Sequence, residues 1–72
     1  MRRFTIRAAR VNAGYSQKTA ASLLKISPYT LSNWERGISM PKANHIDAIC
    51  DLYGVTFDML IFLPNKSALS QL

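Results

Sequence analysis

Residues 27–37, SPYTLSNWERG, carry side chains whose types and spacing suit recognition by hydrogen bonding. On a helix with about 100° per residue, one contiguous stripe collects hydrogen-bonding groups, a flat phenol ring and one cation: Pro28, Tyr29, Ser32, Asn33 and Arg36. Leu31 and Trp34 fall on the opposite side. Ser and Asn donate and accept hydrogen bonds, and a guanidinium suits phosphate or guanine. The pattern predicts a helix with one buried edge and one edge that binds a polar partner.

The base edges of a DNA major groove fit this stripe, because the groove presents donors and acceptors and is wide enough to admit one helix. A solvated helix that happens to lack acids is the alternative. The preceding turn favours the first interpretation, since only Lys25 and Ile26 lie between Leu24 and Ser27, the length of a helix-turn-helix connection. The helix that starts at Pro28 is therefore the candidate reader of a DNA sequence.

Residues with catalytic or metal-binding chemistry are few and scattered. His45 is the only histidine and Cys50 the only cysteine, so the chain offers no zinc cluster, and it has no Gly-rich loop for a nucleotide. Asp47 and Asp51, four residues apart on a predicted helix, are expected to be solvated, and Asp58 forms no site with them. We expect His45 at the boundary of the core and Cys50 as a small core residue. The sequence predicts no enzymatic activity, no metal, no cofactor and no small-molecule substrate.

Charge is distributed unevenly along the 72 residues, whose formal net charge is +5. Residues 1–42 hold eight Lys or Arg and one acid, a net charge of +7, whereas residues 43–72 hold one Lys and three Asp, a net charge of −2. A basic majority beside an acidic remainder indicates one positive face, for which a phosphate backbone is the usual partner. A protein that is merely soluble and basic is the alternative.

The termini and the apolar runs bear on location. The start, MRRFTIRAAR, lacks the apolar segment of a secretory signal, and an organelle transit peptide is disfavoured because residues 6–13 fit the first helix of the fold. The longest apolar run, residues 59–63, is far shorter than the ~20 residues that span a bilayer. One cysteine excludes an internal disulfide and favours a reducing compartment. We expect a cytoplasmic protein that does not bind membranes.

Apolar residues recur three and four positions apart, and no segment alternates with the period of a strand. Five short helices are predicted: residues 6–13; a second capped by Ser16; a third capped by Ser27 with Pro28 in its first position; a fourth over residues 42–53; and a fifth after Thr56. The expected fold is all-α and compact, with one domain over residues 1–64 and a loosely ordered tail over 65–72.

Across residues 4–62 the sequence resembles the Cro/phage-repressor family of helix-turn-helix proteins, also called XRE-type. The matching residues are Ile6, Arg10, Gly14, Tyr15, Ser16, Gln17, Ala21, Ile26, Ser27, Thr30, Leu31, Ser32, Trp34, Glu35, Gly37, Pro41, Ile46, Ile49, Gly54, Val55, Thr56, Asp58 and Leu60. The resemblance implies a five-helix lambda-repressor-like domain. It also implies a bacterial or phage transcription regulator, a repressor, that binds specific sequences of double-stranded DNA.

The resemblance further implies roles for residues at matching positions. Those expected to read bases are Gln17, Pro28, Tyr29, Ser32 and Asn33. Those expected to contact phosphates are Ser16, Arg10, Lys25, Arg36 and Lys42. Arg10 and Glu35 are expected to form a structural ion pair between the first and third helices, because either charge alone would be costly among their apolar neighbours.

Two departures from the family pattern carry predictions of their own. Lys25 replaces the Gly that commonly closes the second helix, so a non-Gly residue is expected in the left-handed conformation. Pro28 and Tyr29 replace the Gln or Ser often found at the front of the reading helix, which favours contact with a thymine methyl group over a bidentate hydrogen bond.

A homodimer is expected because one helix-turn-helix buries only ~600–1,000 Å² on DNA, whereas two copies can read a palindromic operator. The predicted interface is an apolar segment near the end of the chain: Met59, Ile61, Phe62 and Leu63. Alternatively, this segment folds back over the first and fourth helices. A further alternative for the whole protein is an antitoxin that binds a partner toxin through its apolar tail and its own promoter through the same helices.

Overall fold

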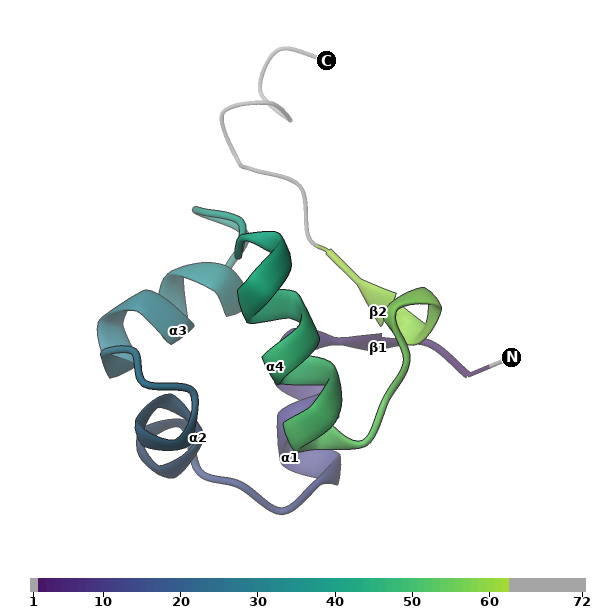
Figure 1. Ribbon diagram of the computed structural model, residues 1–72, viewed down its shortest axis with the longest axis horizontal. Coiled ribbons are helices and arrows are strands. Elements are labelled where there is room, and N and C mark those ends of the chain that lie inside the picture. Colours follow the sequence, from purple (N-terminus) through teal and green to yellow (C-terminus); the bar gives the residue numbers. More distant parts are fainter. Residues whose placement is uncertain (1, 63–72) are drawn as a thin grey trace, which may run out of the picture.

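The computed structural model describes residues 2–62, so Leu63 and the predicted tail over residues 65–72 lie outside the described residues. Its elements, in chain order, are β1 (Phe4–Thr5), α1 (Ile6–Asn12), α2 (Gln17–Leu23), α3 (Pro28–Glu35), α4 (Ala43–Tyr53), the 3-10 helix η1 (Phe57–Met59) and β2 (Leu60–Ile61). Figure 1 shows α2 and α3 at one end of the molecule and the β1–β2 pair on the other side, with α1 and α4 between them.

Side-chain caps set the start of the first three helices. The Ser16 and Ser27 hydroxyls accept hydrogen bonds from the backbone N–H groups of Thr19 and Thr30, each at 3.1 Å, which confirms both predicted caps. Pro28 occupies the first turn of α3, where its missing N–H costs no helical bond. Thr5 caps α1 in the same way, through the N–H of Ala8 at 3.1 Å. These three helices therefore begin where a side chain satisfies a backbone donor, whereas α4 begins after Lys42 without a side-chain cap.

The turn between α2 and α3 is tight because its backbone bonds close the end of α2. The N–H of Ile26 donates to the carbonyl of Ala21 at 3.0 Å, and the N–H of Lys25 donates to that of Ser22 at 3.1 Å. Lys25 has a φ of 61°, so the predicted left-handed conformation of this non-Gly residue is confirmed. This turn fixes the direction in which α3 leaves α2.

Within residues 2–62, ten apolar residues from the four α-helices, the C-cap of α2 and β2 form the core: Ile6, Ala9, Ala20, Ala21, Leu24, Leu31, Trp34, Ile49, Tyr53 and Leu60. Ala20 and Ala21 are fully buried, and their small side chains allow the backbone of α2 to lie close to its neighbours. Leu31 and Trp34 anchor α3 from its inner side. The core thus holds α3 by one edge, and the other edge is exposed at Pro28 and Tyr29 and half-buried at Ser32 and Asn33.

The prediction of five helices and no strand is wrong for the last part of the described chain. In place of a fifth α-helix, the segment after Thr56 forms one turn of 3-10 helix and then β2, which pairs in parallel with β1 in the register Phe4↔Leu60 and Thr5↔Ile61. The Thr56 side chain makes no capping bond to the backbone of this turn, although the Thr56 carbonyl accepts from the N–H of Met59 at 3.0 Å. Leu, Ile and Phe favour extended backbone when a partner strand is available. Two-residue strands are too short to produce a period-two signal in the sequence.

Candidate DNA interface

The predicted two-sided character of α3 is present in the structure. Leu31 and Trp34 are buried, whereas Tyr29 keeps 76% of its surface exposed and Pro28 is exposed beside it. Ser32 and Asn33 are half-buried along the same helix. Pro28, Tyr29, Ser32 and Asn33 form what we call the α3 stripe. It presents a ring face, a hydroxyl and an amide, and no acid.

The C-terminal end of α3 is closed by backbone bonds. The carbonyl of Asn33 accepts from the N–H of Ile38 at 2.9 Å and from that of Ser39 at 3.4 Å. Arg36 follows as the C-cap residue and is exposed. Both bonds are made by the one backbone carbonyl of Asn33, so they do not occupy its side-chain amide.

The ion pair that the sequence predicts between α1 and α3 is present and buried. Nε of Arg10 donates to Oε2 of Glu35 at 2.7 Å and Nη2 to Oε1 at 3.3 Å, with 10% and 3% of the two side chains exposed. Hydrogen bonding to Glu35 raises the pKa of Arg10, against the opposing effect of burial. The third contact of the guanidinium is Nη1 to the carbonyl of Tyr15 at 2.9 Å.

This geometry corrects one predicted role of Arg10. A phosphate contact was expected in addition to the ion pair, but the residue is buried and three of its nitrogen atoms already donate to Glu35 and Tyr15. Moving the guanidinium out to a phosphate would leave the Glu35 carboxylate buried without its charge partner, which is costly. Arg10 is therefore held in the buried ion pair, and its surroundings do not favour the predicted phosphate contact.

Gln17 makes a contact that sequence reasoning missed. Its Nε2 donates to Oε1 of Glu35 at 3.2 Å, so the first residue of α2 is tied to the last residue of α3. The side chain is half-buried, and the same carboxylate thus serves α1, α2 and α3. A buried carboxylate has more acceptor lone pairs than one guanidinium can fill. This surplus could have indicated from the sequence that Glu35 accepts from a further donor.

The remaining residues predicted to contact phosphates are exposed and lie at element ends around α3. Ser16 precedes α2, Lys25 lies in the α2–α3 turn, Arg36 ends α3 and Lys42 precedes α4. The Ser16 hydroxyl is engaged locally, accepting from the Thr19 N–H and bonding its hydroxyl at 3.0 Å. Lys25 thus precedes α3 and Arg36 ends it, whereas Lys42 lies further along the chain, directly before α4.

The acidic residues lie elsewhere. Asp47 and Asp51 are exposed on α4, and Asp58 is exposed on η1. The Asp58 carboxylate accepts a hydrogen bond from the Thr56 hydroxyl, and this bond lowers the pKa of Asp58. Apart from the buried Glu35, the acids of residues 2–62 are therefore outside α2, α3 and the turn between them.

His45 and Cys50 stand in separate, structural environments. The His45 ring packs against that of Trp34, with centroids 5.1 Å apart, and the residue is half-buried as expected. Cys50 packs at the edge of the core, and burial, aided by Asp47 and Asp51, raises the pKa of its thiol. Among residues 2–62, no three side chains of His, Cys, Asp or Glu are grouped to hold a metal ion.

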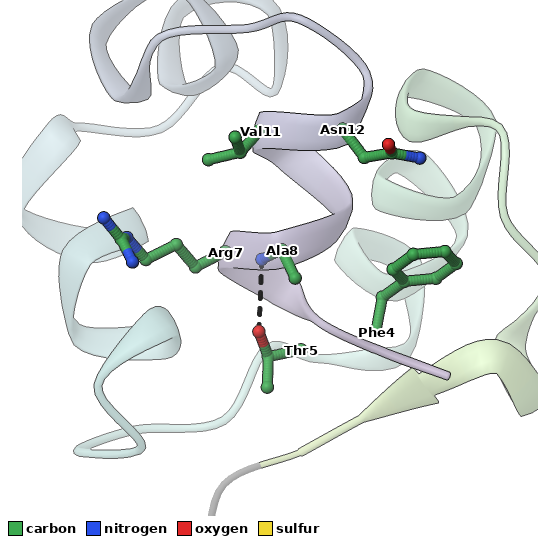
Figure 2. Close-up of a pocket in the computed structure, with 6 residues that line it drawn as sticks. All are labelled: Phe4, Thr5, Arg7, Ala8, Val11 and Asn12. Carbon is green, nitrogen blue, oxygen red and sulfur yellow. Dashed lines mark hydrogen bonds between the residues drawn. The ribbon is translucent and has the colours of Figure 1, made fainter. Parts of the chain in front are cut away.

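A hollow of about 450 Å³ lies beside α1 and β1, and Figure 2 shows the residues that line it. Its walls come from β1 and α1 alone: Phe4, Thr5, Arg7, Ala8, Val11 and Asn12. Figure 2 shows Arg7 and Phe4 extending to opposite sides of α1, with the Thr5 hydroxyl bonded to the N–H of Ala8. Arg7 is the only ionisable side chain in this wall, so the hollow offers no acid–base pair.

The segment predicted to form a dimer interface is split between core and surface. Leu60 is buried and Phe62 packs against the core, whereas Ile61 is 40% exposed and Met59 is half-buried. Phe57, which the sequence prediction omitted, is 61% exposed and its ring lies 5.9 Å from that of Phe62. Phe57 and Ile61 together are called the β2 patch below. The alternative of a segment folded back over the core thus holds for part of it.

None of the helices within residues 2–62 has the length and apolar character needed to span a bilayer.

Comparison with known proteins agrees with this geometry. The chain matches the helix-turn-helix family over residues 6–60. It is 39% identical over 56 residues to the HTH-type transcriptional regulator ImmR of Bacillus subtilis (strain 168). This match covers 78% of the chain and 44% of ImmR, so the chain spans less than half the length of that relative. The chain belongs to the XRE-type helix-turn-helix family of DNA-binding transcription regulators.

Proposed function

We propose that this protein regulates transcription by binding a specific sequence of double-stranded DNA with α3 in the major groove. The observation that carries this proposal is the α3 stripe, an acid-free edge of hydrogen-bonding groups on a helix whose other edge is fixed in the core. Ser32 and Asn33 supply donors and acceptors for base edges. Pro28 and the exposed ring of Tyr29 supply apolar contact for a thymine methyl group.

Contacts to the sugar-phosphate backbone would hold the domain in register. Lys25, Arg36 and Lys42 are exposed around α3, and Ser16 lies at the start of α2. Such contacts fix position and supply affinity without reading sequence. They also make binding depend on salt, since each neutralised phosphate releases counterions. The proposed setting is the cytoplasm of a bacterium, where the DNA is directly accessible.

A homodimer on a palindromic operator is part of the proposal. Two copies with reading helices ~34 Å apart would contact successive major grooves on one side of the duplex. The β2 patch supports such a dimer, because Phe57 and Ile61 expose apolar surface that a second copy can bury. We propose repression as the outcome, since a domain seated over a promoter blocks polymerase by occupancy alone. ImmR, to which the chain is similar, is a transcriptional regulator, which supports this role.

The β2 patch also supports a second candidate, an antitoxin. In that case Phe57 and Ile61 would bind a partner toxin while α3 still binds a promoter. Purification of the tagged protein from its native host separates the two candidates. A second protein recovered in equal amount indicates the antitoxin, whereas the chain alone indicates the homodimer.

Fluorescence anisotropy with a duplex selected from a random pool tests the function. Using −0.9 per phosphate, four or five phosphates per subunit predict a slope of log K against log salt near −4 for one copy and about −8 for two. Competition with unrelated duplex measures specificity. Equal affinity for selected and unrelated duplexes would contradict sequence-specific regulation.

A further inference from the structure

The hollow beside α1 and the exposed turn η1 are complementary in chemistry. The hollow has apolar walls and one guanidinium, that of Arg7, whereas η1 exposes an aromatic ring and a carboxylate side by side, those of Phe57 and Asp58. We propose that in the homodimer η1 of each copy docks in the hollow of the other, with the Phe57 ring against the apolar walls and the Asp58 carboxylate on Arg7. The proposal rests on the homodimer of the proposed function, and it names both surfaces of the interface.

The size and walls of the hollow suit an aromatic side chain. Its volume of about 450 Å³ lies in the range of about 300–1,000 Å³ in which proteins hold small ligands. Figure 2 shows Arg7 and Val11 on one side of α1, Phe4 on the other and the small side chain of Ala8 between them. Val11 is 57% exposed, so the wall offers apolar surface that a docked ring would cover. Aromatic rings that fill such spaces are the usual anchors of protein interfaces.

Charge gives the hollow a preference for an acidic partner. Arg7 is the only ionisable side chain in its wall and is exposed, and it forms no ion pair with another residue of the described chain. A guanidinium binds a carboxylate through two parallel N–H bonds, and this attraction grows when neighbouring groups exclude water. The hollow therefore favours a partner that carries an acid directly beside its apolar group.

The turn η1 carries this combination of groups. Phe57 is 61% exposed, and the exposed Asp58 follows it directly. Hydrogen bonds from Thr56 and from its own backbone, and to a lesser degree the charge of Arg3, lower the pKa of Asp58, so the carboxylate is ionised at neutral pH. An ionised carboxylate has acceptor sites left for a further donor. The acids of α4 lack this character, since α4 has none of the large exposed apolar residues of the described chain.

The two surfaces are neighbours in the fold, as a twofold interface requires, because one patch must supply both the ring and the hollow. β1 contributes Phe4 and Thr5 to the hollow and pairs with β2, which directly follows η1. Thr5 lies opposite Ile61 of the β2 patch in this register, and α1 also contacts β2. A reciprocal contact between two copies would therefore cover the hollow and the β2 patch together.

Charge reversal tests the proposal in the absence of DNA. Arg7→Glu and Asp58→Arg each place like charges at both contacts of a twofold dimer, so sedimentation equilibrium should show each dimer weakened by at least about tenfold. An equimolar mixture of the two variants should dimerise about as tightly as wild type, because both contacts of the mixed dimer again join a cation to an acid. The double variant should do the same. Rescue by mixing requires that the two residues meet across copies.

Matched variants control for net charge and for added side-chain volume. Lys18→Glu on α2 and Asp51→Arg on α4 change the net charge by the same amounts outside both surfaces, and they should leave the dimer unchanged. Ala8→Leu fills the hollow and should weaken the dimer by about tenfold or more, whereas Ala43→Leu at the start of α4 should not. All substituted positions are exposed, so thermal melts should match wild type. The pair of Leu variants gives an independent comparison if a charge variant does not fold.

Four results would overturn the inference. A wild type that stays monomeric has no such interface. Weak dimers in the two charge variants and in their mixture alike would show that Arg7 and Asp58 do not meet across copies. Dimers of wild-type strength in both charge variants, or in Ala8→Leu, would place the interface away from the hollow.

Selection of bound duplexes from a random pool separates this inference from the proposed function. A protein that selects a sequence but fails the charge-reversal test overturns the inference alone. A protein that passes the charge-reversal test but selects no sequence overturns the proposed function alone, because none of the substituted residues is assigned to the DNA interface.

Discussion

Asn33 and Lys42 represent the two kinds of contact in the proposed DNA complex. Asn33 lies on the α3 stripe, and its amide matches a base edge, whereas Lys42 is an exposed cation before α4. Asn33→Ala is expected to relax discrimination at one base pair, at a cost of about 1–3 kcal/mol for the selected duplex. Lys42→Ala is expected to weaken selected and unrelated duplexes alike and to reduce the salt slope by about one.

Competition titrations with both duplexes measure the two variants on one scale. The assignment of the reading edge is wrong if Asn33→Ala lowers affinity for both duplexes by the same factor. The assignment of Lys42 is wrong if its variant loses affinity for the selected duplex only.

Tyr53 gives the protein a pH-dependent stability that is independent of DNA. Burial, and secondarily the charge of Glu35, raises the pKa of Tyr53 to about 12 against an opposing effect of Arg10. The folded state therefore keeps a proton that the unfolded chain releases near pH 10, its ordinary value. The resulting stability is complete below pH 10 and is lost as the pH rises from 10 to 12, amounting to at most about 2–3 kcal/mol.

Urea unfolding between pH 9 and 11.5 measures this effect, with Tyr53→Phe as the control for all other titrating groups. The Tyr53 hydroxyl has no hydrogen-bond partner among the described residues, so the variant is expected to be as stable as wild type at pH 7, within about 1 kcal/mol. The wild type should lose more stability than the variant above pH 10. Parallel curves for the two proteins would show that the pKa is not shifted.

At the scale of elements, the sequence predicted the helix caps and the turn conformation that depend on one residue and its near neighbours. Ser16 and Ser27 cap their helices, and Lys25 takes the left-handed conformation, because each depends on neighbours a few positions away. The sequence did not predict the two short strands. β2 forms because its segment meets β1, more than fifty residues earlier in the chain, and two residues carry no period of their own.

Lys25 is expected to hold its left-handed conformation at a cost. For a residue with a Cβ this conformation costs ~1–2 kcal/mol, whereas Gly adopts it freely but loses more entropy on folding. Lys25→Gly should therefore raise the free energy of unfolding slightly, by up to about 1 kcal/mol. Lys18→Gly, on the exposed surface of α2, is the matched control and should lose about 0.5–1 kcal/mol. Equal losses at both sites in thermal melts would contradict the strain assigned to Lys25.

At the scale of the whole molecule, the sequence predicted the separation of charge and the two edges of α3, both of which follow from residue type and helical spacing. It did not predict that Gln17 joins the Arg10–Glu35 pair, since that contact depends on how α2 and α3 cross. It also assigned Arg10 a phosphate contact that burial disfavours, and it overlooked the exposed Phe57. Contacts between elements depend on how those elements pack against each other. The residue pattern along a single element does not predict that packing.

The β2 patch makes a prediction about assembly. Replacing Phe57 and Ile61 together by Ser should convert a dimer to a monomer in sedimentation equilibrium and halve the salt slope, because the apolar surface that a second copy buries is removed. Met40→Ser, an exposed apolar residue in the α3–α4 connection, serves as the control and should leave assembly unchanged. A double variant that still sediments as a dimer would place the interface elsewhere.

The most direct test of the central claim is an NMR titration of the labelled protein with its selected duplex. The account predicts intermolecular contacts from the side chains of Tyr29, Ser32 and Asn33 to major-groove protons of the bases, while signals of the β2 patch respond equally to selected and unrelated duplexes. If those three side chains show no contact to base protons, or contact only a second copy of the protein, then α3 is not the reading helix.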